Sequence, residues 1–308
     1  MLATLVREPF SNKQWIFEPK LDGIRCLAFR RGPQISLFSR NQLRLDNEFS
    51  EIPRPLLQQS LDNFILDGEV VAIDRGVSSF SRLQKRKQSN VPVFYYIFDL
   101  LYLNGFDLTQ MELRYRKELL QHVFLFRDPL RLTEHHEASG ERFFRQACRK
   151  GWEGIIAKRA ASLYLPKRSL DWQKIKCENE QEFVIVGYTE PTGQRVGIGA
   201  LLLGVYDRNK CRYAGKVGTG FDTQMLNELK RKLSRIERET AACETLSLRE
   251  KGVHWVEPKL VAQIAFTEWT GAGKLRHPRF LGLRFDKPAR SVVMEKPHGN
   301  KTARPRRA

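Results

Sequence analysis

The sequence predicts an α+β protein in which antiparallel sheets with helices are followed by a small β-barrel. Two observations lead to this prediction. Runs of β-branched and aromatic residues, such as Phe64 to Ile73 and Val93 to Leu100, recur through the first half with helical stretches between them. After Cys177 the strands are shorter, and turns rich in Gly, Asp and Asn separate them. The 308 residues suffice for about two domains, each with its own core.

The first half is expected to contain four further strands and one clear helix. The strands are expected at residues 15–18, 26–29, 35–38 and 154–157. Asp22-Gly23 separates the first two of these, and an Asp-Gly pair between apolar runs is typical of a hairpin. The helix is expected over 140–150, because Ser139 is a good N-cap residue and Gly151 a good stop.

A polar stretch at 178–181 suits a hinge between domains. We therefore predict domains at 1–178 and 179–295, followed by a disordered basic tail over 296–308. The second domain is expected to contain strands at 183–188, 200–206, 211–217 and 260–266, and a helix whose apolar stripe is Leu226, Leu229, Leu233 and Ile236. Several short strands and one helix in roughly 110 residues fit a Greek-key barrel of the oligonucleotide-binding (OB) type.

The composition points to a basic, non-membrane protein. Lys and Arg number 53 against 35 Asp and Glu, which gives a formal net charge of +18. Such a charge favours nucleic acid through counterion release, although it also serves solubility. Apolar runs are too short to span a bilayer, and the first residues lack the apolar core of a secretory signal. We therefore expect a cytoplasmic, nucleoid-associated protein. The five scattered cysteines predict neither a disulfide framework nor a zinc site.

The sharpest local pattern is Glu18-Pro19-Lys20-Leu21-Asp22-Gly23-Ile24-Arg25. It places a lysine at the end of a strand, before a tight turn and an arginine. Neighbouring cations lower the pKa of a lysine, and a neutral amine is what a lysine nucleophile requires. The pattern K-x-D-G alone is also a common hairpin sequence.

Five more patterns follow in a set order. They are Ser39-Arg40-Asn41, Leu66-Asp67-Gly68-Glu69, Tyr96-Ile97-Phe98-Asp99, Glu153-Gly154-Ile155-Ile156-Ala157-Lys158 and Trp172-Gln173-Lys174-Ile175-Lys176. Lys174 and Lys176 share one face of a strand, where two amines can stabilise charge on a phosphate. Glu69 and Glu153, both in apolar strands, can hold a hard divalent cation. Each pattern taken singly also fits ordinary strand residues.

In this order the patterns resemble the covalent nucleotidyltransferase superfamily, specifically ATP-dependent DNA ligases, over about residues 15–288. The finer resemblance is to the ligase module of bacterial end-joining ligases, through segments at 76–84, 172–177, 182–189 and 266–278. It implies an adenylation (nucleotidyltransferase) domain followed by an OB-fold domain. The chain has no length for the polymerase and phosphoesterase modules that accompany such ligases.

The resemblance implies a role for each residue. Lys20 is the expected nucleophile, assisted by Lys174 and Lys176. The expected ATP ligands are Glu18, Arg25, Arg40, Phe98, which would stack on adenine, Lys158, and Arg284 and Lys287 of the pattern Arg284-Phe285-Asp286-Lys287-Pro288. Mg²⁺ or Mn²⁺ is expected on Glu69 and Glu153.

These features predict an enzyme that seals nicked or broken duplex DNA through a lysyl-AMP intermediate. The DNA backbone is expected to contact a basic loop formed by Arg82, Lys85, Arg86 and Lys87, a segment that also fits a solvated loop. We expect a monomer with a bacterial Ku-type end-binding partner. The alternatives are an RNA ligase, an mRNA-capping guanylyltransferase, or a non-catalytic nucleic-acid-binding protein on this scaffold.

Overall fold

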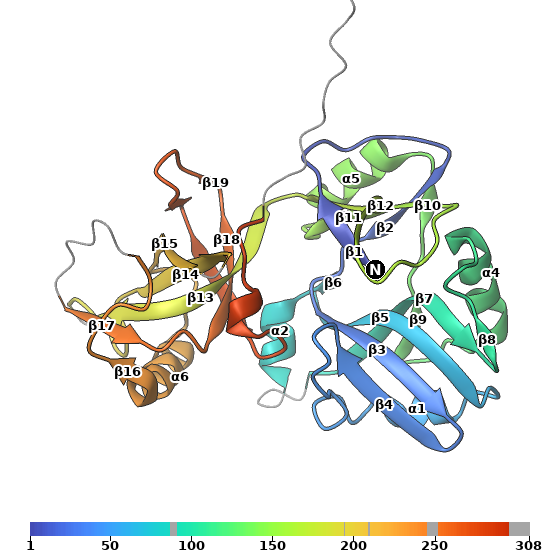
Figure 1. Ribbon diagram of the computed structural model, residues 1–308, viewed down its shortest axis with the longest axis horizontal. Helices are drawn as coiled ribbons and strands as arrows, with labels where there is room; N and C mark the ends of the chain where they lie inside the picture. Colours follow the sequence, from blue (N-terminus) through green and yellow to red (C-terminus); the bar gives the residue numbers. More distant parts are fainter. Residues whose placement is uncertain (87–90, 194, 209, 245–251, 296–308) are drawn as a thin grey trace, which may run out of the picture. The chain divides into compact units, whose positions relative to one another are not determined.

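The computed structural model describes residues 1–86, 91–193, 195–208, 210–244 and 252–295. Its contacts divide them into two compact units, Met1–Cys177 and Glu178–Glu295 (Figure 1). Lys87 and the tail at 296–308 lie outside the described residues. In the described part of the chain, no helix is both long and apolar enough to cross a membrane.

The first unit contains two sheets. One has the order β1 (Leu2–Leu5), β12 (Arg168–Lys176), β11 (Gly154–Arg159), β2 (Trp15–Pro19) and β10 (His136–Glu137). The other has the order β4 (Gln34–Ser39), β3 (Ile24–Arg31), β5 (Asn63–Asp74), β7 (Val93–Leu103) and β8 (Phe106–Asp107), with β6 (Val77–Ser78) on β5 and β9 (Leu130–Leu132) on β7. Pairing is antiparallel except for β1 with β12 and β7 with β9. This confirms the predicted class for the first half.

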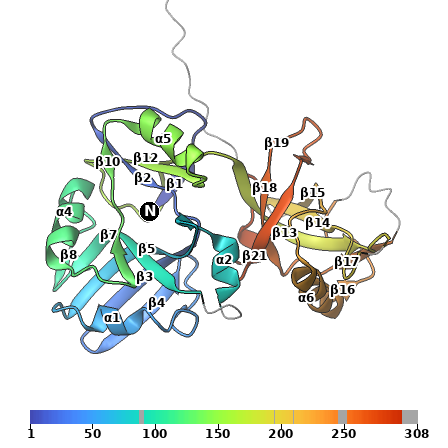
Figure 2. The same ribbon diagram turned by 180° about the vertical axis from the view of Figure 1, so that it is seen from behind.

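The described residues of this unit include the helices α1 (Pro53–Leu57), α2 (Phe80–Gln84), α4 (Leu113–Val123) and α5 (Gly140–Arg149), which cover these sheets. Helix α5 packs on β11 and β2 (Figure 2). Its predicted start is confirmed, and it ends at Arg149, one residue before the predicted end, with Lys150 as the C-cap and Gly151 following at φ +73°. Ser139 does not cap it through its side chain. The Ser11 hydroxyl instead accepts a hydrogen bond from the Glu141 N–H at 3.2 Å.

The Asp22-Gly23 turn connects the two sheets, so the predicted hairpin is wrong. Strand β2 pairs with β10 and β11, whereas β3 pairs with β4 and β5. A Cβ at Gly23 would lie 2.3 Å from the Val70 carbonyl oxygen, so glycine is required for the close approach. The Asp22 carboxylate accepts a hydrogen bond from the Phe80 N–H at 2.8 Å. Lys20, just before this turn, therefore lies where the two sheets meet.

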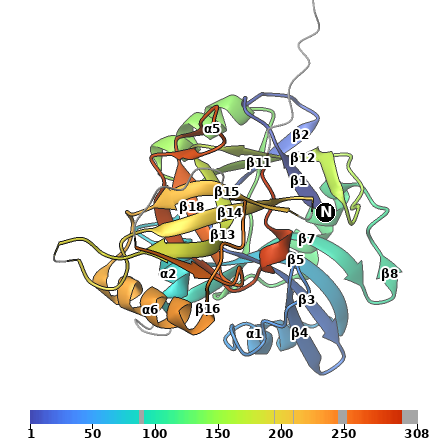
Figure 3. The same ribbon diagram turned by 60° about the vertical axis from the view of Figure 1, so that its left-hand side comes forward.

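The second unit is a curved, antiparallel sheet with one helix, α6 (Thr223–Leu233) (Figure 3). Its strands are β13 (Asn179–Thr189), β14 (Leu201–Asp207), β15 (Lys210–Val217), β16 (Glu237–Arg238), β17 (Val253–Val256), β18 (Val261–Phe266) and β21 (Arg279–Arg284). A separate two-stranded sheet is formed by β19 (Glu268–Trp269) and β20 (Leu275–Arg276). Leu226, Leu229 and Leu233 are buried, as the predicted stripe requires.

Strand β13 corrects the predicted hinge. Its first residues, 179–181, pair with β18, and its last ones pair with β17, so β13 extends through the stretch read as a linker. The Gln181 amide is buried there: it donates to the Val293 carbonyl at 3.2 Å and accepts from the Glu295 N–H at 3.0 Å. The step between the units is therefore short, at Cys177-Glu178.

The cysteines also correct the sequence analysis. Cys148 at the end of α5 pairs with Cys177 after β12, and Cys211 pairs with Cys243 in the second unit. Cys26 is free and buried. The Cα atoms of Cys148 and Cys177 are 5.4 Å apart despite a sequence separation of 29 residues. Spacing along the chain could not reveal this proximity.

A buried ion pair attaches α4 to β7 and gives a stability prediction. The Arg116 and Asp99 side chains are both 0% exposed, and two guanidinium nitrogens each lie 2.8 Å from an Asp99 oxygen. We expect Arg116→Leu to lower the free energy of unfolding by about 3–5 kcal/mol, because it leaves a buried carboxylate without its cation. Urea unfolding followed by circular dichroism measures this. The exposed Arg114→Leu, on the same helix, is the control and should cost about 1 kcal/mol or less. Equal losses in the two variants would contradict the prediction.

Candidate active site

Lys20 lies among residues from three strands of the first sheet. Its N–H donates to the Gly154 carbonyl at 2.9 Å, which joins the end of β2 to β11. Its Nζ lies 2.5 Å from one oxygen of Glu153, and the Lys176 Nζ lies 3.8 Å from the other. Glu153 immediately precedes β11 rather than lying in a strand as predicted. Lys174, two residues before Lys176 on β12, is half-buried opposite Ile156.

The charge environment of Lys20 is opposite to the predicted one. Burial alone lowers the pKa of Lys20, but the charges of Glu153, Glu69 and Asp22 outweigh burial and hold the pKa above its usual range. The prediction of a lowered pKa was wrong because it assumed cationic neighbours. Arg25, the cation expected nearby, is instead paired with Asp67, at 2.9 Å from Nε and 2.5 Å from Nη2.

A cavity of about 120 Å³ adjoins Lys20 and brings most of the predicted nucleotide ligands together. Its lining includes six of the predicted residues, Glu18, Lys20, Arg25, Glu69, Phe98 and Lys158. It also includes Trp172, which the sequence analysis assigned no role. The Lys158 Nζ lies 4.1 Å from the centroids of both aromatic rings, Phe98 and Trp172. Arg40 is not part of this lining: it is exposed and borders a different cavity of about 600 Å³, beside Phe38 and Tyr164.

Glu18 is buried in the wall of the small cavity between two lysines. One carboxylate oxygen lies 2.6 Å from the Lys117 Nζ and the other 2.6 Å from the Lys158 Nζ. Burial alone raises the pKa of Glu18, but the two ammonium groups outweigh it and keep the pKa below its usual range. Sequence reasoning missed Lys117, which belongs to α4 and lies outside all six patterns. What distinguishes Lys117 from the other described lysines of the chain is its burial in an amphipathic helix, and this burial is visible only in the structure.

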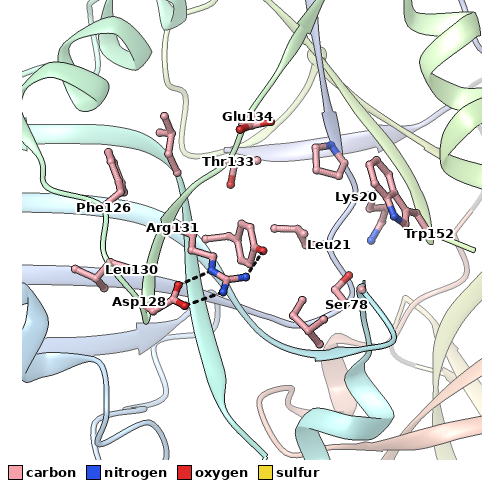
Figure 4. A pocket seen from close by; sticks show the side chains of 15 residues that line it. Lys20, Leu21, Ser78, Phe126, Asp128, Leu130, Arg131, Thr133, Glu134 and Trp152 are labelled. Carbon is pink, nitrogen blue, oxygen red and sulfur yellow. Dashed lines mark hydrogen bonds and ion pairs between the residues drawn. The ribbon is translucent and has the colours of Figure 1, made fainter. Parts of the chain in front are cut away.

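Lys20 also borders a second, larger cavity of about 530 Å³ (Figure 4). Arg131 lies in its wall, where the guanidinium binds both oxygens of Asp128, at 2.7 and 2.9 Å, and the Tyr96 hydroxyl at 3.0 Å. Trp152 lies close to Lys20 in this view. The same lysine is therefore accessible from two cavities of different size.

The predicted residues of the second unit form ion pairs within that unit. Arg284, at the end of β21, binds both oxygens of Asp286 at 2.8 Å. Lys287 forms an ion pair with Glu182 of β13.

The basic segment predicted to contact DNA is not a uniform loop. Arg82 is exposed on the short helix α2, and Lys85 at its end is half-buried. Arg86 is only 6% exposed. Its guanidinium lies 2.5 Å from a Glu48 oxygen and 4.7 Å from the centroid of the Phe49 ring. Arg86 thus has a structural role, and its prediction as a solvent-facing cation is wrong.

A lysine beside acidic residues and an aromatic cavity, in a two-sheet domain that precedes a small barrel, is typical of a covalent nucleotidyltransferase with an OB-fold domain. Residues 1–176 match the family model of the ATP dependent DNA ligase domain, and residues 194–287 match that of the ATP dependent DNA ligase C terminal region. The chain belongs to the ATP-dependent DNA ligase family.

Relatives and solved structures agree with this assignment. The chain is 38% identical, over 97% of its length, to the multifunctional non-homologous end joining protein LigD of Pseudomonas aeruginosa. It is 37% identical, over 92% of its length, to the LigD protein of Mycobacterium tuberculosis. It spans 36% and 38% of these two relatives. The structure of mycobacterial DNA ligase D complexed with ATP and MES aligns with a TM-score of 0.67 at 33% identity, over 96% of this chain and 98% of that one. The predicted family and fold class are confirmed.

The ion pairs of Glu18 give a pH-dependent stability prediction. Its pKa is lowered in the folded chain, so the unfolded chain takes up a proton first as pH falls below the ordinary value of 4.5. The stabilisation is therefore complete near neutral pH and is lost as pH falls through the folded value. We expect the difference in unfolding free energy between wild type and Glu18→Gln to be largest near neutral pH and to shrink below 4.5. Urea unfolding at several pH values measures it, with the exposed Glu118→Gln as control. A difference that stays constant down to acid pH would refute the prediction.

Proposed function

We propose that this chain is an ATP-dependent DNA ligase that forms a covalent lysyl-AMP intermediate at Lys20. The observation that carries the proposal is the position of the Lys20 amine. It borders a cavity lined by Phe98 and Glu18 and lies 2.5 Å from Glu153. Membership of the ATP-dependent DNA ligase family supports it, as does the ATP found with the mycobacterial DNA ligase D structure.

In the first step, the Lys20 nitrogen forms a bond with the α-phosphorus of ATP. The bond from that phosphorus to the bridging oxygen breaks, and pyrophosphate leaves with the electron pair. Lys20 is held as an ammonium in the resting site, so it must first lose a proton, and Glu153 is the base in contact with it. Lys174 and Lys176 supply positive charge for the phosphates.

We assign a divalent metal ion such as Mg²⁺ or Mn²⁺ to Glu69 and Glu153. Both carry carboxylate oxygens, which hard divalent cations prefer, and the charges of both act on Lys20. A metal ion held by these residues would neutralise phosphate charge and weaken the hold of the carboxylates on the Lys20 ammonium.

In the later steps, AMP passes to DNA and the strand is closed. A 5′-phosphate oxygen at the break attacks the phosphorus of lysyl-AMP, and the nitrogen–phosphorus bond breaks. The neighbouring 3′-hydroxyl then attacks the 5′-phosphate, and AMP leaves. Arg284 and Lys287 are assigned to the pyrophosphate. They are ion-paired with Asp286 and Glu182, so this role requires them to exchange partners.

The proposed substrate is nicked or broken duplex DNA. Its support is the family and the end-joining names of the LigD relatives, together with the net charge of +18. A Ku-type end-binding protein as partner, a monomeric state and a nucleoid-associated, cytoplasmic location complete the proposal.

Replacement of Lys20 tests the proposal directly. We expect Lys20→Arg to abolish both the adenylate adduct and the ATP-driven sealing of nicks. A guanidinium does not lose its proton in proteins, so it cannot act as the nucleophile. Denaturing electrophoresis after incubation with labelled ATP and Mg²⁺, followed by a nicked-DNA chase, measures both. The exposed Lys13→Arg should behave as wild type. An adduct that persists in Lys20→Arg would contradict the proposal, and labelling by GTP or sealing restricted to RNA nicks would favour the alternative enzymes.

DNA contact through α2 is tested by replacing the exposed Arg82 and the half-buried Lys85 at the end of the helix. We expect Arg82→Ala combined with Lys85→Ala to weaken binding to nicked duplex and to reduce the slope of log Kd against log salt by about 1–2, because up to two phosphate contacts are lost. Self-adenylylation should not change. Binding titrations at several salt concentrations measure the slope. The matched control removes two exposed cations of the same unit that lie outside α2, Arg114 and Arg142. A wild-type slope in the α2 variant would show that this helix does not contact DNA.

A further inference from the structure

Lys117 is a buried lysine that the proposed reaction does not use. It belongs to α4 and is 5% exposed. Its ammonium lies 2.6 Å from Glu18 Oε1, 3.3 Å from the Thr133 carbonyl oxygen and 3.4 Å from the Phe98 carbonyl oxygen. An ammonium has three donors, so these three acceptors account for all of them. The position of the Lys117 ammonium is therefore fixed from three directions.

Lys117 does not line the small cavity, but its three acceptors belong to residues that do, Glu18, Phe98 and Thr133. Only Glu18 accepts through its side chain, since the other two acceptors are backbone carbonyl oxygens. Each carboxylate oxygen of Glu18 is bonded to one lysine and can accept a second hydrogen bond. Because two ammonium groups keep the carboxylate ionised, Glu18 has no proton to donate. The wall of the cavity thus presents a fixed hydrogen-bond acceptor.

The dimensions and walls of the cavity fit a nucleobase rather than a whole nucleotide. Its volume of about 120 Å³ is below the roughly 300–1,000 Å³ that encloses a drug-sized ligand. Phe98 and Trp172 supply aromatic walls against which a flat ring can pack. A base that enters must therefore present one of its edges to Glu18.

We propose that Lys117 is a positioning residue that fixes the Glu18 carboxylate as an acceptor, so that the cavity selects a purine with an amino group at the facing edge over one with a carbonyl. An amino group donates to the carboxylate. A carbonyl oxygen would instead place one acceptor against another, with no proton between them, which is costly in a buried site. The inference rests on the proposed function, since the base belongs to the nucleotide that is transferred to Lys20.

Lys158 does not serve equally well as the test residue. Its ammonium also bonds to Glu18, but it lines the cavity and lies against both aromatic rings. Its replacement would change the walls of the cavity together with the carboxylate. Replacement of Lys117 removes no side chain from the lining, and Glu18 is the only side-chain acceptor that loses its partner, because the other two acceptors are the backbone carbonyls of Phe98 and Thr133.

The experiment compares self-nucleotidylation of the full chain with ATP and with inosine triphosphate, in which a carbonyl replaces the amino group. Two variants remove the charge of Lys117, Lys117→Gln and Lys117→Met. If only one of them folds, that variant alone is sufficient for the test. Lys117→Arg keeps the charge, and Arg114→Gln removes an exposed charge from the same helix. Thermal melts establish which variants fold, and rates over a range of nucleotide concentrations give the half-saturating concentration and the maximal rate.

We expect wild type to prefer ATP, and the neutral variants to lose about tenfold or more of this preference. The loss should come mainly from the half-saturating concentrations, because the interaction is with the bound base. Lys117→Arg and Arg114→Gln should keep the wild-type preference. General damage to the fold would slow both nucleotides equally and leave their ratio unchanged.

Two results would overturn this inference while the proposed function stands. One is a folded neutral variant with the wild-type ratio, and the other is a wild-type enzyme that uses both nucleotides equally well. The absence of an adduct with either nucleotide in wild type would instead refute the proposed function itself.

Discussion

The close approach of β2, β11 and β12 around Gly154 is the constraint on which the candidate site depends. Gly154 has φ +152°, and a Cβ there would lie 2.0 Å from the Ile175 carbonyl oxygen. Its own carbonyl accepts the Lys20 N–H at 2.9 Å. Glu153 precedes Gly154 in the chain, and Lys176 is the cross-strand partner of Gly154 on β12. A larger side chain at this position would separate the amine from its carboxylate.

Charge compensation within the site explains why a strongly basic chain can bury so many cations. Lys20 is paired with Glu153, Arg25 with Asp67, and Lys117 with Glu18. The charge of +18 is therefore a property of the chain as a whole and not of this site. Burying an isolated charge is costly, and these pairs remove that cost while fixing each side chain in one direction. The same pairing holds the pKa of Lys20 above its usual range, so the proposed reaction requires a change at these carboxylates before Lys20 attacks.

Local sequence signals predicted the elements well but not their partners. The strands around Lys20, the helix α5 and the apolar stripe of α6 follow from periodicity and stop signals, which depend on neighbours in sequence. The Asp22-Gly23 turn was recognised, but turn propensity does not specify whether the flanking strands join one sheet or two. The stretch at 178–181 was read as a linker from its polarity, although residues 179–181 pair with β18 and the Gln181 amide bonds to Val293 and Glu295. The pairing of Cys148 with Cys177 and the burial of Arg86 are likewise consequences of tertiary packing.

Lys20 borders two cavities, and their different walls suit them to different parts of the proposed reaction. The small cavity has aromatic walls and a fixed carboxylate, and it can hold one flat base in one orientation. The larger cavity has a guanidinium fixed by Asp128 and Tyr96, and it leaves room beside the same amine. In the proposed reaction, the Lys20 amine receives AMP and then passes it on, so the site must keep AMP bound while a second reactant approaches. Binding the base on one side and leaving space on the other satisfies both requirements without moving Lys20, whose backbone is fixed by β11.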